Sequence, residues 1–322
     1  MYKKILVTGG TALVGNAIKS VQHDYLDREF VFTGSKDCDL TNKDETLKYV
    51  QNCRPDAIIH LAAISGGISL STKHPATMLR DNVLMSLYIL EAARIFDVKK
   101  VVMTLTSGMY PIDAPNPIKE EYIHEGCPHE SNYGSSFAKR LIEPAIRAYR
   151  TEYGMNVIGL VPNGMFGEND NFNYDDAPLV PVLVRRFYEN RQGDSKIVVR
   201  GDGTPLREYT YSEDVAKAFM WCLDNYSDAQ ILNMGSTEEH SIKEIAFIIA
   251  DAMSIDRGRI VFSESRSGGI HRKSTDNSKF VRLSNFEYTP FKVGVEKTVR
   301  WFCTTYENGT IRTDNKVGKD EV

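Results

Sequence analysis

The sequence has few of the features that mark secreted, membrane or metal-binding proteins. Its five cysteines are scattered and form no CxxC pair, which favours free thiols in a reducing compartment over disulfides. No apolar run approaches the ~18 residues that a membrane-spanning helix needs. The cysteines and histidines lack the spacing of a zinc site, so we expect no metal. We therefore expect a cytoplasmic protein without a membrane partner.

An excess of charge of one sign is also lacking. The 39 basic and 43 acidic residues leave a formal net charge of −4, which gives no reason to expect nucleic acid as a partner. Hydrophobic residues make up 42% of the 322 residues and charged residues 25%, values that are ordinary for a globular enzyme. A chain of this length accommodates two domains, and any anion must bind through local groups rather than overall charge.

Short β-branched runs alternate with longer helical patterns through the first half of the chain. The runs predict strands at 4–7, 30–32, 57–60, 100–105 and 157–161. The patterns between them predict helices at 14–21, 43–52, 75–96 and 136–153. Such alternation indicates an α/β fold, a Rossmann-type doubly wound parallel sheet with helices on both faces.

The second half of the chain has a less regular pattern. Loops rich in Asn, Asp, Gly and Pro separate helices predicted at 182–190, 213–225, 242–253 and 295–306. We expect a smaller α+β domain there. The predicted organisation is a cofactor-binding domain at 1–165, a substrate domain at 166–310 that returns some chain to the first domain, and a polar tail at 311–322.

A glycine-rich turn follows the first predicted strand and opens the first predicted helix. Its residues include Gly9, Thr11, Ala12, Leu13, Val14 and Gly15. Glycines there let backbone amides approach a pyrophosphate, which then lies at the positive end of the helix. The position of the turn predicts a dinucleotide site; the alternative is a tight turn in which Gly15 serves only packing.

The tip of the second predicted strand bears on the choice of dinucleotide. An acidic residue at this tip holds the ribose 2′-hydroxyl of NAD. This sequence has Ser35 and Lys36 instead, a hydroxyl and a cation that suit the 2′-phosphate of NADP. Asp37 follows directly, so NAD remains the alternative. We predict NADP(H) as the cofactor.

Four segments resemble the GDP-L-fucose synthase family of extended short-chain dehydrogenases/reductases. They are TGGTALVG at 8–15, HLAA at 60–63, TSGMYP at 106–111 and FGENDNF at 166–172. The resemblance implies an NADPH-dependent homodimer that acts on a GDP-linked 4-keto sugar, epimerising C3 and C5 before it reduces C4. It also implies further cofactor contacts at Leu61, Ala62, Ala63, Lys139 and Pro162.

The resemblance assigns reduction to a serine, a tyrosine and a lysine. Ser107 matches the serine that bonds the carbonyl oxygen, and Lys139 matches the lysine that lowers the pKa of the proton-donating tyrosine. Ser135 stands at the tyrosine position, and a serine hydroxyl is a weaker acid that ends roughly 4 Å closer to the backbone. Either Tyr133 or a bridging water supplies the proton, or Ser135 is a disabling replacement.

Two further positions depart from the family. The family has a cysteine and a histidine that move the protons at C3 and C5, and this sequence has Gly108 and Pro178 there. We therefore predict a reductase that has lost epimerase activity and is fed by a separate epimerase. A bifunctional enzyme with Cys127 as substitute base is the first alternative. The second is a C4 oxidase or 4-epimerase that recycles its nicotinamide. The third is a catalytically impaired protein that binds a nucleotide sugar, because Ser135 lacks the phenol.

The resemblance also implies substrate contacts, most of them in the second half of the chain. Guanidinium groups bind diphosphates through paired hydrogen bonds, so arginines in a cleft suit a nucleotide sugar. The predicted substrate residues are Ser107, Gly108, Asn171, Pro178, Arg186, Arg200, Arg207 and Arg266. Arg200 stands where bacterial members have a tryptophan, and with Pro178 it favours a sugar other than fucose, such as a different hexose or a heptose.

Overall fold

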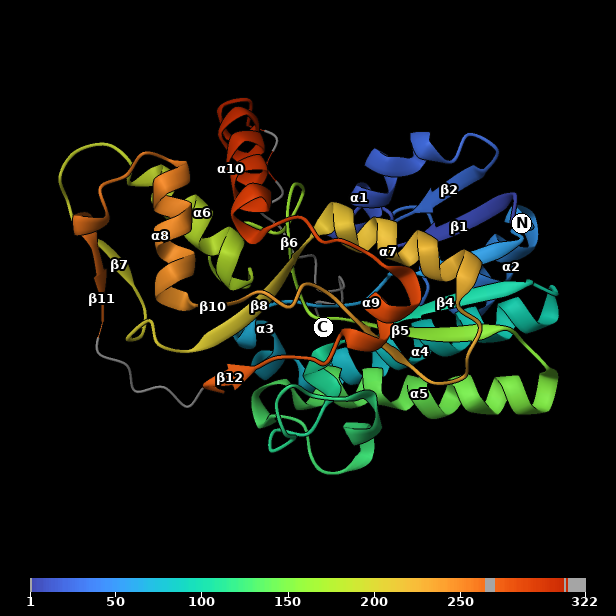
Figure 1. The fold of residues 1–322 in the computed structure, drawn as a ribbon. Helices are drawn as coiled ribbons and strands as arrows, with labels where there is room; N and C mark the ends of the chain where they lie inside the picture. Colours follow the sequence, from blue (N-terminus) through green and yellow to red (C-terminus); the bar gives the residue numbers. More distant parts are fainter. Residues whose placement is uncertain (1, 264–269, 310, 312–322) are drawn as a thin grey trace.

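The larger layer of the molecule is a six-stranded parallel sheet with the strand order β2-β1-β3-β4-β5-β9 (Figure 1). The computed structural model describes residues 2–263, 270–309 and 311. The strands of this sheet are β1 (Lys4–Thr8), β2 (Glu29–Thr33), β3 (Ala57–His60), β4 (Lys100–Thr104), β5 (Val157–Pro162) and β9 (Leu232–Met234). The strand order runs outward in both directions from β1 and β3, so the predicted doubly wound sheet is confirmed.

Helices cover both faces of the sheet (Figure 1). The side chains of Ile5 and Val7 belong to the buried cluster under α1 and α7, whereas Leu6 belongs to the cluster under α2, α4 and α5. This alternation follows from the two-residue period of a strand and buries both faces, as a parallel sheet requires. The five helices are α1 (Leu13–Val21), α7 (Ser212–Asn225), α2 (Lys43–Cys53), α4 (Pro75–Ile95) and α5 (Tyr133–Tyr153).

A second, smaller lobe combines short strands with three of the later helices (Figure 1). Its strands are β6 (Gly164–Phe166), β8 (Leu206–Tyr211), β10 (Glu239–Ser241) and β12 (Arg272–Lys273) in one sheet, and β7 (Ile197–Val199) with β11 (Ile260–Phe262) in another. The helices are α6 (Leu179–Glu189), α8 (Ile242–Ala252) and α10 (Phe291–Glu307). Their apolar faces meet in a third buried cluster, which contains Phe187, Ile245 and Phe302.

The chain passes between the two lobes more than once. After β8 it returns to the large sheet as α7, which packs on α1, and as β9, which pairs with β5. It then enters the small lobe again at β10, and α9 (Ser278–Ser284) comes back to lie beside β9. The limits at residues 165 and 310 therefore remain a prediction, and most of the predicted tail lies outside the described residues.

Several helices differ from the sequence prediction. Helix α6 begins at Leu179 rather than at 182, because Pro181 lies in the first turn, where a missing backbone N–H costs nothing. Helix α5 begins at Tyr133 rather than at 136. The short helices α3 (Ile68–Lys73) and α9 were not predicted. Within the part of the chain that the structure describes, no helix has the length and apolar character to cross a membrane.

Candidate active site

The predicted glycine turn lies at the carboxyl edge of the large sheet, between β1 and α1. Gly9 has a φ of +70°, and a Cβ there would lie 2.8 Å from the backbone nitrogen of Ala62 at the end of β3. A Cβ on Gly15 would lie 2.5 Å from the carbonyl oxygen of Gly9. Helix α1 follows with no side chain capping its first amides, so they remain available to an anion. The backbone of the turn thus packs so closely on itself and on the segment after β3 that no side chain fits at either glycine.

The ends of neighbouring strands bring the other predicted cofactor residues to the same edge. His60, the last residue of β3, is paired with Thr8 and precedes the segment Leu61, Ala62 and Ala63. Pro162 ends β5 two strands further along. Parallel strands present their carboxyl ends together, which is why segments far apart in the sequence meet here.

The tip of β2 carries the residues that were predicted to select the dinucleotide. Ser35 and Lys36 are exposed to solvent. The carboxylate of Asp37 accepts a hydrogen bond of 2.8 Å from the backbone N–H of Gly34. This acidic group is therefore held within its own loop.

Lys139 lies on the buried face of α5. Its Nζ donates a hydrogen bond of 2.8 Å to the carbonyl oxygen of Thr104, the last residue of β4. Burial lowers the pKa of Lys139 to about 8. His60 is fully buried nearby, and burial together with the charge of Lys139 lowers its pKa to about 3. At neutral pH the imidazole is therefore uncharged, with Nδ1 2.8 Å from the hydroxyl of Thr8.

The tyrosine position of α5 holds a short hydroxyl. The half-buried Ser135 donates from Oγ to the carbonyl oxygen of Asn132 at 3.1 Å. Because Ser135 and Lys139 are four residues apart on one helix, they share a face of α5. Tyr133 lies on another face: its ring packs edge-on against Phe137, and 45% of its surface is exposed. The structure thus brings Ser135, and not Tyr133, to the side of Lys139.

Ser107 and Gly108 open a short 3-10 helix directly after β4 (Ser107–Met109). The hydroxyl of Thr106 caps this turn by accepting from the N–H of Gly108 at 3.2 Å. A Cβ on Gly108 would lie 3.5 Å from the hydroxyl oxygen of Thr106 and 3.6 Å from that of the buried Ser136. Sequence reasoning missed Thr106 and Ser136, although the hydroxyl beside Ser107 on the same loop was a signal for Thr106.

Pro178 and Asn171 lie in the loop that leads into α6. The amide of Asn171 donates to the carboxylate of Asp176 at 2.9 Å. The carbonyl oxygen of Asp176 in turn accepts from the N–H of Gly67, in the loop that follows β3. Pro178 is the residue before α6. The loop before α6, which is predicted to contact the substrate, is therefore attached to the strand edge where the predicted cofactor residues lie.

Two of the predicted arginines line one cavity of about 340 Å³ beside α6 and β7. Arg186 reaches it from α6, and its Nη1 donates to the carbonyl oxygen of Val198 at 2.9 Å. Arg200 lies at the end of β7, and Lys196 adds a third cation. The lining also contains Tyr174, Asn190, Ile197 and Val198. Among the described residues, the lining contains three cations and no carboxylate, a charge that suits an anionic ligand.

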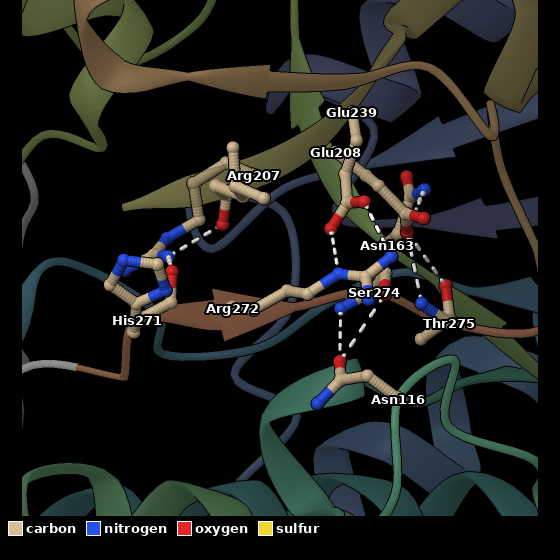
Figure 2. Close-up of polar contacts among 10 residues, drawn as sticks. Asn116, Asn163, Arg207, Glu208, Glu239, His271, Arg272, Ser274 and Thr275 are labelled. Atoms are coloured by element: carbon tan, nitrogen blue, oxygen red, sulfur yellow. Dashed lines mark hydrogen bonds and ion pairs between the residues drawn. The ribbon is translucent and has the colours of Figure 1, made fainter. Parts of the chain in front are cut away.

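Arg207 lies on β8 and is not part of the lining of that cavity. Its Nη1 donates to the carbonyl oxygens of Leu206 at 2.7 Å and His271 at 3.3 Å (Figure 2). Burial lowers its pKa, so its positive charge is poorly solvated. Arg266 falls outside the described residues.

Comparison with known proteins gives the chain its family. The NAD dependent epimerase/dehydratase family matches residues 5–235. The GDP-L-fucose synthase of Dictyostelium discoideum is 34% identical over 310 residues, which cover 95% of this chain and 97% of that protein. The chain belongs to the GDP-L-fucose synthase family. The predicted family is therefore confirmed.

Solved structures agree with this assignment. A GDP-L-fucose synthetase from Naegleria fowleri bound to NADP superposes with a TM-score of 0.90 at 36% identity, covering 97% of this chain and 95% of that chain. The GDP-mannoheptose C4 reductase from Campylobacter jejuni superposes with a TM-score of 0.84 at 23% identity, covering 94% of this chain and 98% of that chain. The second likeness shows the fold alone.

Proposed function

We propose that the chain is an NADP(H)-dependent reductase that converts the C4 ketone of a GDP-linked sugar to an alcohol without epimerising C3 or C5. One contrast carries this proposal. Lys139 is held at the end of β4, whereas Gly108 and Pro178 place no acid–base group beside it. The name and the bound NADP of the Naegleria relative support the cofactor and the GDP-sugar substrate.

The residues at the carboxyl edge of the large sheet fit NADP(H). The close approach of the backbone at Gly9 and Gly15 allows the pyrophosphate to contact the first amides of α1. Lys36 and Ser35 are exposed where the 2′-phosphate would lie, and Asp37 is bonded to Gly34 rather than free to hold a 2′-hydroxyl. When bound, NADPH supplies the hydride that reduces the ketone.

The chain must supply a proton to the alkoxide that forms at C4. Lys139 is a buried cation at this place, and its charge stabilises an adjacent oxyanion. The hydroxyl of Ser135 lies on the same face of α5 but ends roughly 4 Å short of a tyrosine hydroxyl, by standard bond lengths. We infer that a water held between Ser135 and the substrate delivers the proton, which makes turnover slow.

Two residues, Arg200 and Pro178, bear on which sugar the chain reduces. The cavity beside Arg186 and Arg200 has the charge for a nucleotide, and Arg200 replaces an aromatic platform with a cation. Pro178 removes a polar side chain from the substrate loop. Both changes favour a sugar other than fucose, either a different hexose or a heptose.

One observation favours a second candidate function. Ser135 has no phenol to donate, and its hydroxyl is bonded to Asn132. A protein that binds NADP and a nucleotide sugar without turning them over would show the same arrangement. The retention of Lys139 in its buried place speaks for catalysis, because burying an ammonium is costly and a pure binder gains nothing from it.

The direct test is NADPH oxidation by the purified chain in the presence of a GDP-4-keto sugar that has already been epimerised. The proposal expects oxidation that depends on the sugar and is weaker with NADH. If NADPH and GDP both bind but no oxidation occurs, the second candidate is correct. If GDP does not bind, the substrate class is wrong.

We also propose a homodimer that forms through α4 and α5, and a cytoplasmic location. Phe137 and Leu141 on α5 support the dimer, since 36% and 47% of their surfaces are exposed on one helix face. Sedimentation should give twice the mass of one chain, and Leu141→Asp should give a monomer. A wild-type monomer would contradict the dimer.

A further inference from the structure

The loop after β4 and helix α5 border a small space at Gly108, which we call the Gly108 gap. A Cβ on Gly108 would meet the hydroxyl oxygen of Thr106 at 3.5 Å, the hydroxyl oxygen of Ser136 at 3.6 Å and the methyl carbon of Thr106 at 3.7 Å. These are ordinary contact distances, so a small group fits there. Two of the three nearest atoms are hydroxyl oxygens, so a group that enters the gap meets a polar surface.

Both hydroxyls keep hydrogen-bonding capacity. Thr106 Oγ1 accepts from the N–H of Gly108 at 3.2 Å, which leaves its own proton to donate. Only 1% of the surface of Ser136 is exposed, and its hydroxyl has no hydrogen-bond partner among the described residues. The hydroxyl of the next serine, Ser135, is bonded to the carbonyl oxygen of Asn132. Buried hydroxyls are as a rule bonded, so Ser136 points to a polar group of a ligand.

The two sides of the gap are fastened to each other. The buried side chain of Arg140 on α5 donates from Nε to the carbonyl oxygen of Met109 at 2.9 Å. Its Nη1 donates to the carbonyl oxygen of Gly126 at 2.6 Å. These bonds hold the loop that carries Thr106 against the helix that carries Ser136. The gap is therefore formed before a ligand arrives, which lowers the entropic cost of binding.

The gap lies beside the place proposed for the C4 ketone. Ser136 and Lys139 are three residues apart on α5 and share a face. Lys139 is bonded to the carbonyl oxygen of Thr104, two residues before Thr106. Ser107, which is predicted to bond the ketone oxygen, directly precedes Gly108. The carbons bonded to C4 are C3, which carries a hydroxyl in a hexose, and C5, which carries C6.

We propose that Ser136 and Thr106 select the substrate by binding one hydroxyl of the sugar in the Gly108 gap. This inference rests on the proposed function, because it assumes that the C4 ketone of a sugar lies beside Lys139. A sugar hydroxyl accepts the proton of Thr106 and donates its own to the oxygen of Ser136. A typical O–H···O distance is about 2.7–2.8 Å, so shifts of about 1 Å complete both bonds.

Other substituents and other side chains do not suit this arrangement. A methyl group makes neither hydrogen bond, and a keto oxygen only accepts. Any side chain at position 108 would place its Cβ in the gap. The selectivity therefore depends on the glycine of this chain. The hydroxyl that is bound belongs to C3 or to C6 of the sugar.

The test is calorimetric titration of the whole chain saturated with NADP⁺, which cannot reduce the ketone. The ligands are a GDP-4-keto hexose that carries hydroxyls at C3 and C6, its 3-deoxy analogue and its 6-deoxy analogue. The wild type should bind the parent sugar roughly tenfold to hundredfold more tightly than one of the analogues, as expected for the loss of one or two hydrogen bonds. The analogue that binds weakly identifies the carbon.

Two variants act on the gap from its two sides. Ser136→Ala should weaken binding of the parent sugar roughly tenfold and leave the weakly bound analogue unchanged. Gly108→Ala fills the gap with a methyl group and should reduce the preference in the same way. Because the Ser136 hydroxyl makes no bond within the described chain, Ser136→Ala should keep the melting temperature within about 2 °C of wild type. Should Ser136→Ala fail to fold, Gly108→Ala carries the test.

Ser284→Ala on α9 is the control, because its hydroxyl is already bonded to the carbonyl oxygen of Phe280 at 2.7 Å. It should keep the wild-type preference. Equal binding of all three sugars by the wild type would overturn the inference and leave the proposed function standing. A preference that persists in both gap variants would also overturn it. Failure of the wild type to bind any of the three GDP sugars would remove the proposed function, and the inference with it.

Discussion

Lys139 on α5 donates a hydrogen bond of 2.8 Å from its Nζ to the carbonyl oxygen of Thr104 at the end of β4. The bond links the helix to the sheet and fixes the ammonium at the carboxyl edge. Its acceptor is a backbone atom, so the position of the lysine does not depend on the side chain at Ser135. The site therefore has a prepared cation and lacks the phenol that the family places beside it.

Restoring the phenol should raise the rate of ketone reduction. Ser135→Tyr places a hydroxyl roughly 4 Å further from the backbone and on the face of α5 that carries Lys139. We expect kcat with a GDP-4-keto sugar to rise roughly 100-fold or more, the usual contribution of a general acid. The measurement is steady-state NADPH oxidation at saturating sugar.

Ser135→Phe is the matched control for that variant, because it adds the ring without the hydroxyl. It should leave kcat at or below the wild-type value. A wild-type chain that equals Ser135→Tyr would show that another group donates the proton. Rates that rise equally in the Tyr and Phe variants would mean that the ring alone matters.

Placing acid–base groups at Gly108 and Pro178, where this chain departs from the family, should introduce epimerisation. A Cβ on Gly108 would make only ordinary contacts at 3.5 Å, and its backbone is not left-handed, so Gly108→Cys fits without strain. Pro178→His replaces a residue outside α6. The double variant should exchange deuterium from heavy water into C3 or C5 of the keto sugar, as NMR would detect. The wild type should not exchange deuterium into C3 or C5. The double variant Gly108→Ala, Pro178→Ala should not exchange it either.

The glycine turn should be essential for dinucleotide binding. A Cβ on Gly15 would lie 2.5 Å from backbone atoms of the turn. Gly15→Ala must therefore displace the turn, and it should weaken NADPH binding by roughly tenfold or more, which is at least 1.4 kcal/mol. Fluorescence titration with NADPH measures this.

Gly154→Ala controls for general backbone strain. Gly154 has a φ of +67° at the end of α5 and no atom within 4 Å of a Cβ, so the substitution strains the chain far from the turn. It should lower the melting temperature and leave NADPH affinity unchanged. Loss of affinity in both variants would mean that the effect reports stability rather than the site.

Glu208 should make stability fall as pH rises. Burial raises the pKa of this carboxyl to about 7 from an ordinary value of 4.5. The folded chain therefore holds a proton that the unfolded chain has lost, so stability is full below pH 4.5 and is lost as pH rises through 7. Relative to Glu208→Gln, wild type should lose roughly 2–4 kcal/mol of unfolding free energy between pH 4.5 and pH 8. Urea unfolding at several pH values checks this, and parallel pH curves would contradict it.

Much of the large sheet was predictable because its signals are local. The buried strand Ala57–His60 and the glycines at 9 and 15 are recognisable from residue type and short spacing alone. Helix α4 has Pro75 in its first turn and a long apolar pattern, and its predicted end differed by one residue. Such elements depend on periodicity, which a single sequence records directly.

Features that depend on pairing between distant segments were not predictable. Lys273 on β12 lies next to Arg207 on β8 although 66 positions of the chain separate them. No spacing rule connects two such residues. Ser136 was hidden for a similar reason, since its place beside Gly108 follows from how α5 packs on the loop after β4. The separation of Arg207 from the cavity that holds Arg186 was equally invisible in the sequence.

One reaction in heavy water tests whether the chain reduces the ketone without epimerising the sugar. The wild-type chain is incubated with NADPH and an epimerised GDP-4-keto sugar, and NMR locates deuterium in the product. We expect that NADPH is consumed, that C4 becomes an alcohol, and that C3 and C5 carry no deuterium beyond that in a protein-free control. Deuterium at C3 or C5, or an unreduced sugar after both ligands have been shown to bind, would contradict it.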